Sequence, residues 1–128
     1  MTWKRLCHIA WLVGLMVLVG CSRSDTVEVS GLVTWNGEAM PQGDIVFVAA
    51  DPHIAAAAGK IVDGSYKFRC KPGEKRVEVT SYHLTGKKNA DGKPIGEMYV
   101  PERYSSQSTL RADVTYDGSN KFDFSLKP

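Results

Sequence analysis

A strict alternation of apolar and charged residues between Ile61 and Tyr82 constrains the fold more than any other feature of this sequence. Tyr66, Phe68 and Cys70 alternate with basic residues, and the pattern resumes after a break at Pro72-Gly73. A period of two places successive side chains on opposite faces of a pleated strand. The segment therefore predicts an antiparallel meander with one charged face and one apolar face, and the apolar face needs a second sheet to cover it.

The same alternation recurs in most of the chain outside its first 26 residues. Val27 to Trp35 alternates up to the hairpin dipeptide Asn36-Gly37, and Ile45 to Ala49 is apolar on both faces, which is typical of a central strand. Two further alternating runs are Leu110 to Tyr116 and Phe122 to Leu126. Together these segments predict seven strands in about 100 residues, the size of a seven-stranded antiparallel β-sandwich.

The first 20 residues differ from the rest and predict a signal helix. Lys4 and Arg5 precede an apolar run, Leu6 to Val19, that is shorter than the roughly 20 residues needed to span a bilayer. A basic start followed by a short apolar run is typical of a secretory signal peptide. We expect residues 1–20 to be removed; an ordinary cleaved signal without lipid, or an uncleaved anchor, is the alternative.

The run ends in Leu18-Val19-Gly20-Cys21, which resembles a bacterial lipobox. The resemblance implies that the Cys21 thiol receives diacylglycerol and that the chain is cut just before it. Two or more acyl chains anchor a protein stably to a membrane. Residues 21–26 would then form a short lipidated tether to a domain at residues 27–128. Because Ser22, and not an aspartate, follows the cysteine, the resemblance also implies delivery to the outer membrane, on its periplasmic or surface face.

The charge balance excludes one class of partner. The chain has 16 Lys and Arg against 14 Asp and Glu, and Lys4 and Arg5 would leave with the signal peptide, which gives 14 against 14. A domain without net charge has no long-range field to attract nucleic acid. We therefore expect no nucleic-acid partner.

The three cysteines do not predict a disulfide. Cys7 lies in the signal segment and Cys21 is the expected lipid site, so Cys70 has no intramolecular partner. Cys70 shares an apolar strand face with Tyr66 and Phe68. We expect it to be a small buried apolar residue, and a reactive thiol is the alternative.

Several short motifs occur in a fixed order over residues 27–126. They are Val29-x-Gly31-x-Val33-Thr34-x-Asn36-Gly37, then Pro41 and Ile45-x-Phe47, then Gly59-x-Ile61-x-Asp63-Gly64-x-Tyr66, then Pro72-Gly73 and Val77-x-Val79. Their order and spacing resemble those of the carboxypeptidase regulatory-like domain. The resemblance implies a transthyretin-like β-sandwich, and the whole chain is similar to small lipoproteins of planctomycete-type bacteria.

The segment from His83 to Met98 lacks the alternation and is rich in glycine and lysine. It predicts a long solvated connection, a kind of loop that is often mobile or functional. The tyrosines of the next segment, Tyr99 and Tyr104, are expected to pin this loop against the domain, or alternatively to form an exposed contact patch. The candidate binding residues in this part of the chain are Lys87, Lys88, Tyr99, Arg103 and Tyr104.

The sequence offers no recognisable catalytic or metal-binding motif. His53 and His83 are not at ligand spacing, and Asn89-x-Asp91-Gly92 is an incomplete calcium loop. The lysines and arginines at positions 67, 69, 71, 75 and 76 are expected on the outer, solvated face of one hairpin. We predict no catalytic residue, no metal and no cofactor, and hence that the chain is not an enzyme.

These patterns predict a membrane-anchored lipoprotein whose β-sandwich is a non-catalytic structural or protein-interaction module at the cell envelope. Two alternatives remain open. One is a module that binds carbohydrate or an envelope polymer through residues 83–104 and the basic hairpin face. The other is a hydrolase, as the transthyretin-like resemblance allows, although the paired His and Arg that such a site would need are not evident.

Overall fold

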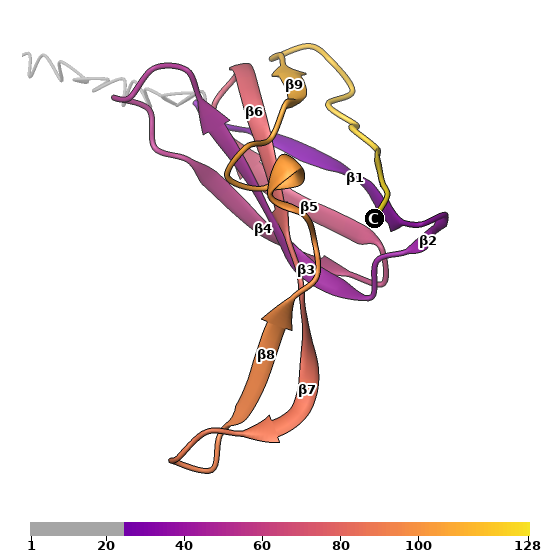
Figure 1. The fold of residues 1–128 in the computed structure, drawn as a ribbon. Coiled ribbons are helices and arrows are strands. Elements are labelled where there is room, and N and C mark those ends of the chain that lie inside the picture. The colour runs from indigo at the N-terminus through magenta and orange to yellow at the C-terminus, as the bar shows by residue number, and fades with distance from the viewer. Residues whose placement is uncertain (1–24) are drawn as a thin grey trace, which may run out of the picture.

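The computed structural model describes residues 25–128 (Figure 1). The expected signal peptide at residues 1–20 and the expected lipid site at Cys21 lie outside the described residues. Within residues 25–128, no helix has the length and the apolar character needed to cross a membrane.

The described chain is all-β, with ten strands and one turn of 3-10 helix. The elements are β1 (Val27–Trp35), β2 (Glu38–Ala39), β3 (Gln42–Ala49), β4 (Ala57–Val62), β5 (Ser65–Cys70), β6 (Gly73–Thr80), β7 (Tyr82–Lys88), β8 (Pro94–Met98), η1 (Glu102–Tyr104), β9 (Leu110–Val114) and β10 (Phe124–Leu126).

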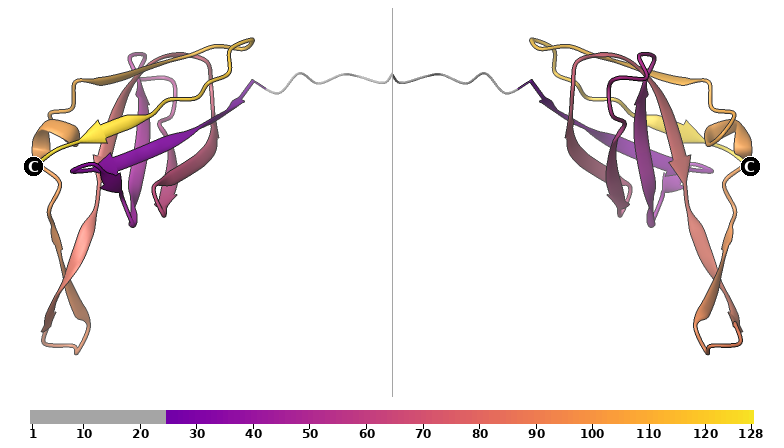
Figure 2. Two further views of the ribbon diagram at one scale, coloured as in Figure 1. Left: turned by 90° about the vertical axis from the view of Figure 1, so that its right-hand side faces the viewer. Right: turned by 90° about the vertical axis from the view of Figure 1, so that its left-hand side faces the viewer.

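Seven strands follow one another in a single curled sheet, in the order β10-β1-β5-β4-β3-β6-β9, and β2 pairs with β1 (Figure 2). These seven correspond to the seven strands that the alternation predicts. β3 lies between β4 and β6, which confirms the prediction of a central strand for Ile45 to Ala49.

The prediction of a wholly antiparallel arrangement is wrong at one edge of this sheet. β10 runs parallel to β1, with Val33 opposite Phe124 and Trp35 opposite Leu126. Strand direction depends on how the chain returns to the sheet, because alternation specifies which face a side chain occupies and not which neighbour its strand acquires. The long connection after β9 brings β10 to β1 in the same direction.

The buried core of the domain contains one aromatic cluster. The Phe47 ring lies edge-on to three other rings, with centroid distances of 6.2 Å to Tyr66, 5.0 Å to Phe68 and 6.1 Å to Phe122. Cys70 is also buried here, which confirms the prediction of a small buried residue. Burial raises the pKa of the Cys70 thiol. This buried core supplies the apolar burial that stabilises the fold.

Two predicted side-chain orientations are wrong. Lys75 was expected on the solvated face, but it is only 2% exposed, because the alternation of β6 places it on the same face as Val77 and Val79. Its neighbours in the register are Ala49 and Ala112, whose small side chains leave room for the aliphatic stem of the lysine. Tyr116 was expected to face inward, but it lies beyond the end of β9 and is 52% exposed.

Gly31 in β1 is required by a close approach of the chain near its other end. A Cβ atom at this position would lie 1.9 Å from the carbonyl oxygen of Phe122. The Phe122 N–H also donates a hydrogen bond of 2.9 Å to the Ser30 carbonyl oxygen. A larger residue at position 31 would therefore push the last part of the chain away from β1.

The segment expected to be a long loop is instead a β-hairpin. β7 and β8 pair only with each other among the described strands, and together they project from the curled sheet (Figures 1 and 2). Asn89 organises the tip, because its side-chain oxygen accepts hydrogen bonds from the N–H groups of Asp91 and Lys93, at 3.0 and 2.9 Å. We call this hairpin, residues 82–98, the arm.

Candidate functional site

The arm exposes an unusual number of large apolar side chains. Leu84 is 70% exposed, Tyr82 51%, Ile95 39% and Met98 37%. Tyr82 lies opposite Met98, and Leu84 lies two residues along from Tyr82, so these three side chains share one face of the hairpin. A two-stranded hairpin gains little stability from burial on its own. This apolar face is therefore the part of the described surface most suited to a partner.

The outer end of the arm is basic. The candidate residues Lys87 and Lys88 lie there at the end of β7, both are exposed, and Lys93 lies across the turn from them. Asp91 is the acidic residue of this turn. The tip is therefore a small positively charged surface, while the Glu97 carboxylate near the root of the arm lies 3.9 Å from Nε2 of His83.

A second feature is a pocket at the root of the arm, where the arm meets the turn after β1. Its volume is about 380 Å³. Its lining residues are Trp35, Glu38, Ala39, Pro41, His83 and Tyr99. We call it the aromatic pocket.

The strand register explains how the pocket forms. Trp35 is the last residue of β1, and the Asn36-Gly37 turn places Glu38 directly opposite it. Asn36 and Gly37 adopt φ angles of 52° and 85°, the left-handed conformation that a tight hairpin of this kind needs. Tyr99 comes from the other side, where its N–H donates to the Ser81 carbonyl oxygen at 3.3 Å.

Three rings line this pocket. The Trp35 and Tyr99 rings have centroids 5.3 Å apart and planes at 74° to each other. The His83 ring lies 5.6 Å from that of Tyr99. Tyr99 therefore packs against the domain, as the sequence predicts, and at the same time forms one wall of a pocket.

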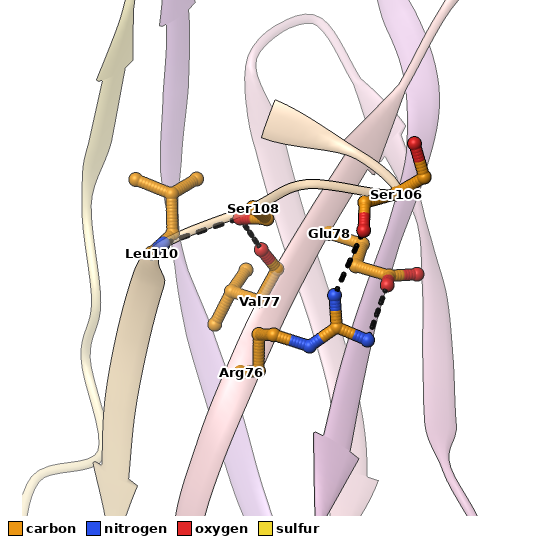
Figure 3. A network of polar contacts seen from close by, with 6 residues as sticks. All are labelled: Arg76, Val77, Glu78, Ser106, Ser108 and Leu110. Atoms are coloured by element: carbon orange, nitrogen blue, oxygen red, sulfur yellow. Dashed lines mark hydrogen bonds and ion pairs between the residues drawn. The ribbon is translucent and has the colours of Figure 1, made fainter. Parts of the chain in front are cut away.

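The chain that returns from the arm is fixed to β6 by a polar network (Figure 3). The Ser108 hydroxyl donates to the Val77 carbonyl oxygen and accepts a bond of 3.2 Å from the Leu110 N–H. The Arg76 guanidinium donates to the Ser106 carbonyl oxygen at 3.3 Å and lies 2.8 Å from the Glu78 carboxylate. These contacts hold the segment after Tyr99 in place and so stabilise the root of the arm.

The remaining candidate residues, Arg103 and Tyr104, hold the end of the chain. Arg103 donates a hydrogen bond of 2.6 Å to the Lys127 carbonyl oxygen, and its guanidinium lies 4.8 Å from the centre of the Tyr104 ring. The Tyr104 hydroxyl oxygen accepts a bond of 3.2 Å from the Lys127 N–H. That hydrogen bond, followed by the effect of Arg103, lowers the pKa of Tyr104.

The structure thus separates the five predicted binding residues into three places. Lys87 and Lys88 lie at the tip of the arm, Tyr99 lies at its root, and Arg103 and Tyr104 contact Lys127. Six residue steps of strand separate Lys88 from Tyr82 at the root, a distance of about 20 Å.

The sequence patterns do not predict Trp35, Glu38 or the role of His83 in the aromatic pocket. The available signal was an aromatic residue at a strand end, followed by an acidic residue just after the Asn36-Gly37 turn. That signal does not indicate which distant residue completes the pocket. As for metals, residues 25–128 contain no group of three or more His, Cys, Asp or Glu side chains that could hold an ion.

Comparison with known proteins gives little. No family model matches the chain, and no curated protein matches it. Among solved structures, the chain is similar to part of a 9R-lipoxygenase from Cyanothece PCC8801, with a TM-score of 0.42 and 11% sequence identity. The match covers 81% of this chain but only 16% of the lipoxygenase chain. The resemblance to carboxypeptidase regulatory-like domains therefore stays a prediction.

One prediction is corrected by this comparison. The sequence patterns predict that the chain is not an enzyme, whereas the matched protein, a lipoxygenase, is one. The prediction is contradicted on that ground, and we do not retain it. A match of this TM-score and identity also assigns no activity to the chain.

Proposed function

We propose that this chain is a lipid-anchored module of a bacterial cell envelope and that it binds a partner protein through its arm. The observation that carries the proposal is the projecting hairpin, with Tyr82, Leu84 and Met98 exposed on one face. Large exposed apolar patches on a small domain indicate interaction sites. The lipobox-like sequence ending at Cys21 supports the anchor and the outer-membrane location.

The arrangement of the strands supports this role, because the arm lies at the end of the domain farthest from the start of β1. Val27 pairs with Cys70, and β6 begins three residues after Cys70 and runs toward the arm, where β7 continues it (Figure 2). Residues 73–88 span at most about 50 Å as strand. A domain tethered at its N-terminal end would therefore present the arm away from the lipid surface.

The proposed partner has an apolar surface bordered by acidic groups. The apolar face of the arm would contact the apolar surface of the partner. Lys87, Lys88 and Lys93 at the tip would contact its acidic groups. Charge complementarity of this kind mainly increases the association rate and the specificity. We also assign the curled sheet, as part of this proposal, to the transthyretin-like β-sandwich of carboxypeptidase regulatory-like domains.

Site-specific photo-crosslinking in cells that make the full chain tests this proposal. A crosslinking residue at Tyr82, on the apolar face of the arm, is expected to give a discrete adduct with another protein. The same residue at Thr109, an exposed position outside the arm, is the positional control and is expected to give none.

Two leucine variants show whether the adduct depends on the apolar face. Leu84→Ser should reduce it by about tenfold or more, as expected for loss of a central apolar contact. Leu32→Ser removes the same side chain at a position that is 48% exposed on the curled sheet, and it should leave the adduct unchanged. Equal adducts from positions 82 and 109, or equal effects of the two leucine variants, would contradict the proposal.

A further inference from the structure

The aromatic pocket has the shape and the chemical groups of a small-molecule site. The rings of Trp35 and Tyr99 stand at 74° and form an apolar corner. The carboxylate of Glu38 and the imidazole of His83 stand at the rim of the same pocket. Ligand sites commonly combine apolar or aromatic walls with a small number of placed polar groups.

We propose that the aromatic pocket binds one ring of a neutral carbohydrate. A pyranose ring has an apolar face of C–H groups, which packs against the flat surface of an aromatic ring, and a rim of hydroxyl groups. Each hydroxyl both donates and accepts hydrogen bonds. It can therefore donate to the Glu38 carboxylate and either donate to or accept from His83. A volume of about 380 Å³ admits one such ring with part of the next.

The charges of the pocket favour a neutral sugar over an acidic one. Glu38 lines the pocket, and the Glu97 carboxylate lies 3.9 Å from Nε2 of His83. Within residues 25–128, the Glu38 carboxylate makes no hydrogen bond or ion pair with the protein, although the Glu38 backbone pairs with Trp35. A uronic acid would bring a third carboxylate to this place, and like charges at short range disfavour binding.

The same groups disfavour an apolar protein side chain as the occupant. Such a side chain would fill the corner between Trp35 and Tyr99, but it would remove water from the Glu38 carboxylate without providing a donor. Burying a charge without a partner is costly. A hydroxyl-bearing ligand satisfies both the rings and the carboxylate.

This inference does not depend on the proposed function of the arm. Leu84 and the lysines of the tip do not line the pocket. A failure of the crosslinking experiment therefore does not bear on sugar binding by the pocket. Conversely, loss of sugar binding by a pocket variant says nothing of the apolar face of the arm.

Trp35 allows a direct measurement at the site. The other two tryptophans, Trp3 and Trp11, lie in the first 20 residues. In the full chain carrying Trp3→Phe and Trp11→Phe, the fluorescence of a detergent-solubilised sample comes from Trp35 alone. Titration with maltotetraose, cellotetraose and chitotetraose is expected to give a saturable change in emission with at least one of them. Tetragalacturonic acid, the acidic probe, is expected to give none.

Variants of the two rim residues test the hydrogen bonds. Both side chains are exposed, so Glu38→Ala and His83→Ala should fold normally, as their melting temperatures would show. Each should weaken sugar binding by about fivefold or more, the loss expected for one hydrogen bond. Glu38→Gln should keep part of the binding of the neutral sugar and reduce the rejection of the acidic probe. Tyr116→Ala, which removes an exposed ring elsewhere, should change neither.

Three results would overturn the proposal. The first is an absence of any change in Trp35 emission with all three neutral probes. The second is binding of the acidic probe as tight as that of the neutral ones. The third is sugar binding that survives unchanged in both Glu38→Ala and His83→Ala, because the sugar would then lie elsewhere.

Discussion

Tyr66 illustrates how a single polar atom is accommodated in an apolar interior. Its ring packs in the aromatic cluster around Phe47, and its hydroxyl donates a hydrogen bond of 2.5 Å to the carbonyl oxygen of Phe122. Burial, assisted by the negative charge of Asp123, raises the pKa of the Tyr66 phenol. The hydroxyl therefore links β5 to the chain just before β10 while remaining protonated.

This raised pKa predicts a loss of stability at alkaline pH. The unfolded chain releases the Tyr66 proton near the ordinary tyrosine value of about 10, whereas the folded protein retains it. The contribution of Tyr66 to the free energy of unfolding should therefore be fully present below pH 10 and should fall as the pH rises above 10. Urea unfolding between pH 8 and pH 11.5 measures this dependence.

Replacement of Tyr66 separates the effect of its hydrogen bond from the effect of its ionisation. Tyr66→Phe should cost about 0.5–1.5 kcal/mol at pH 8 for the lost hydrogen bond, and it should make the alkaline decline shallower. Tyr116→Phe, at an exposed position, controls for the removal of one phenol. An alkaline decline that is as steep in Tyr66→Phe as in the parent would contradict this account.

The arm is an element whose stability is separable from that of the rest. Among the described residues, none of the side chains of the buried core comes from residues 82–98. The tip is held by two hydrogen bonds that the Asn89 side chain accepts from Asp91 and Lys93, together with backbone hydrogen bonds of Asn89 with Gly92 and Lys93. The arm should therefore open locally more readily than the curled sheet unfolds.

The variant Asn89→Ala tests this independence. Loss of the side-chain acceptor should increase amide hydrogen exchange in β7 and β8 by about fivefold, which corresponds to about 1 kcal/mol. The melting temperature should stay unchanged, because the buried core is untouched. A fall in melting temperature of several degrees would show that the arm and the curled sheet unfold together.

The sequence predicts the strands of the curled sheet well and the arm and the pocket poorly, for physical reasons. Burial on one face imposes a period of two, so Tyr66, Cys70 and Val77 identify their strands directly. The arm has both faces in water, so no such pattern is imposed, and Gly86 and Gly96 break what alternation there is. The aromatic pocket brings together Trp35 and Tyr99, which are far apart in the sequence, and a contact between such residues leaves no mark in a local pattern.

At the scale of the whole molecule, the proposed lipid on Cys21 would determine where the domain works. If the anchor is an acyl group, Cys21→Ser should release the protein from the membrane fraction into the soluble fraction, because a single-site substitution removes all the acyl chains. Fractionation of cells followed by immunoblotting measures the distribution.

The size and the location of the variant protein distinguish a lipid anchor on Cys21 from an uncleaved apolar anchor. Cys21→Ala is a second variant that removes the same thiol, and it should behave identically. Residue 25 onward is unchanged in both, so the domain should keep its melting temperature. A variant that still sediments with membranes at the size of the uncleaved precursor would show that the run from Leu6 to Val19 is itself the anchor.

Because β1 pairs with β10, one side of the first strand of the domain has no partner strand until the last strand has been synthesised. The Leu32 N–H, for example, donates to a carboxylate oxygen of Asp123, 91 residues later in the sequence. Contacts of such long range slow folding, since a large loop must close before they form. A chain exported amino end first through a channel would therefore be unable to complete the pairing of β1 with β10 until its final residues emerge.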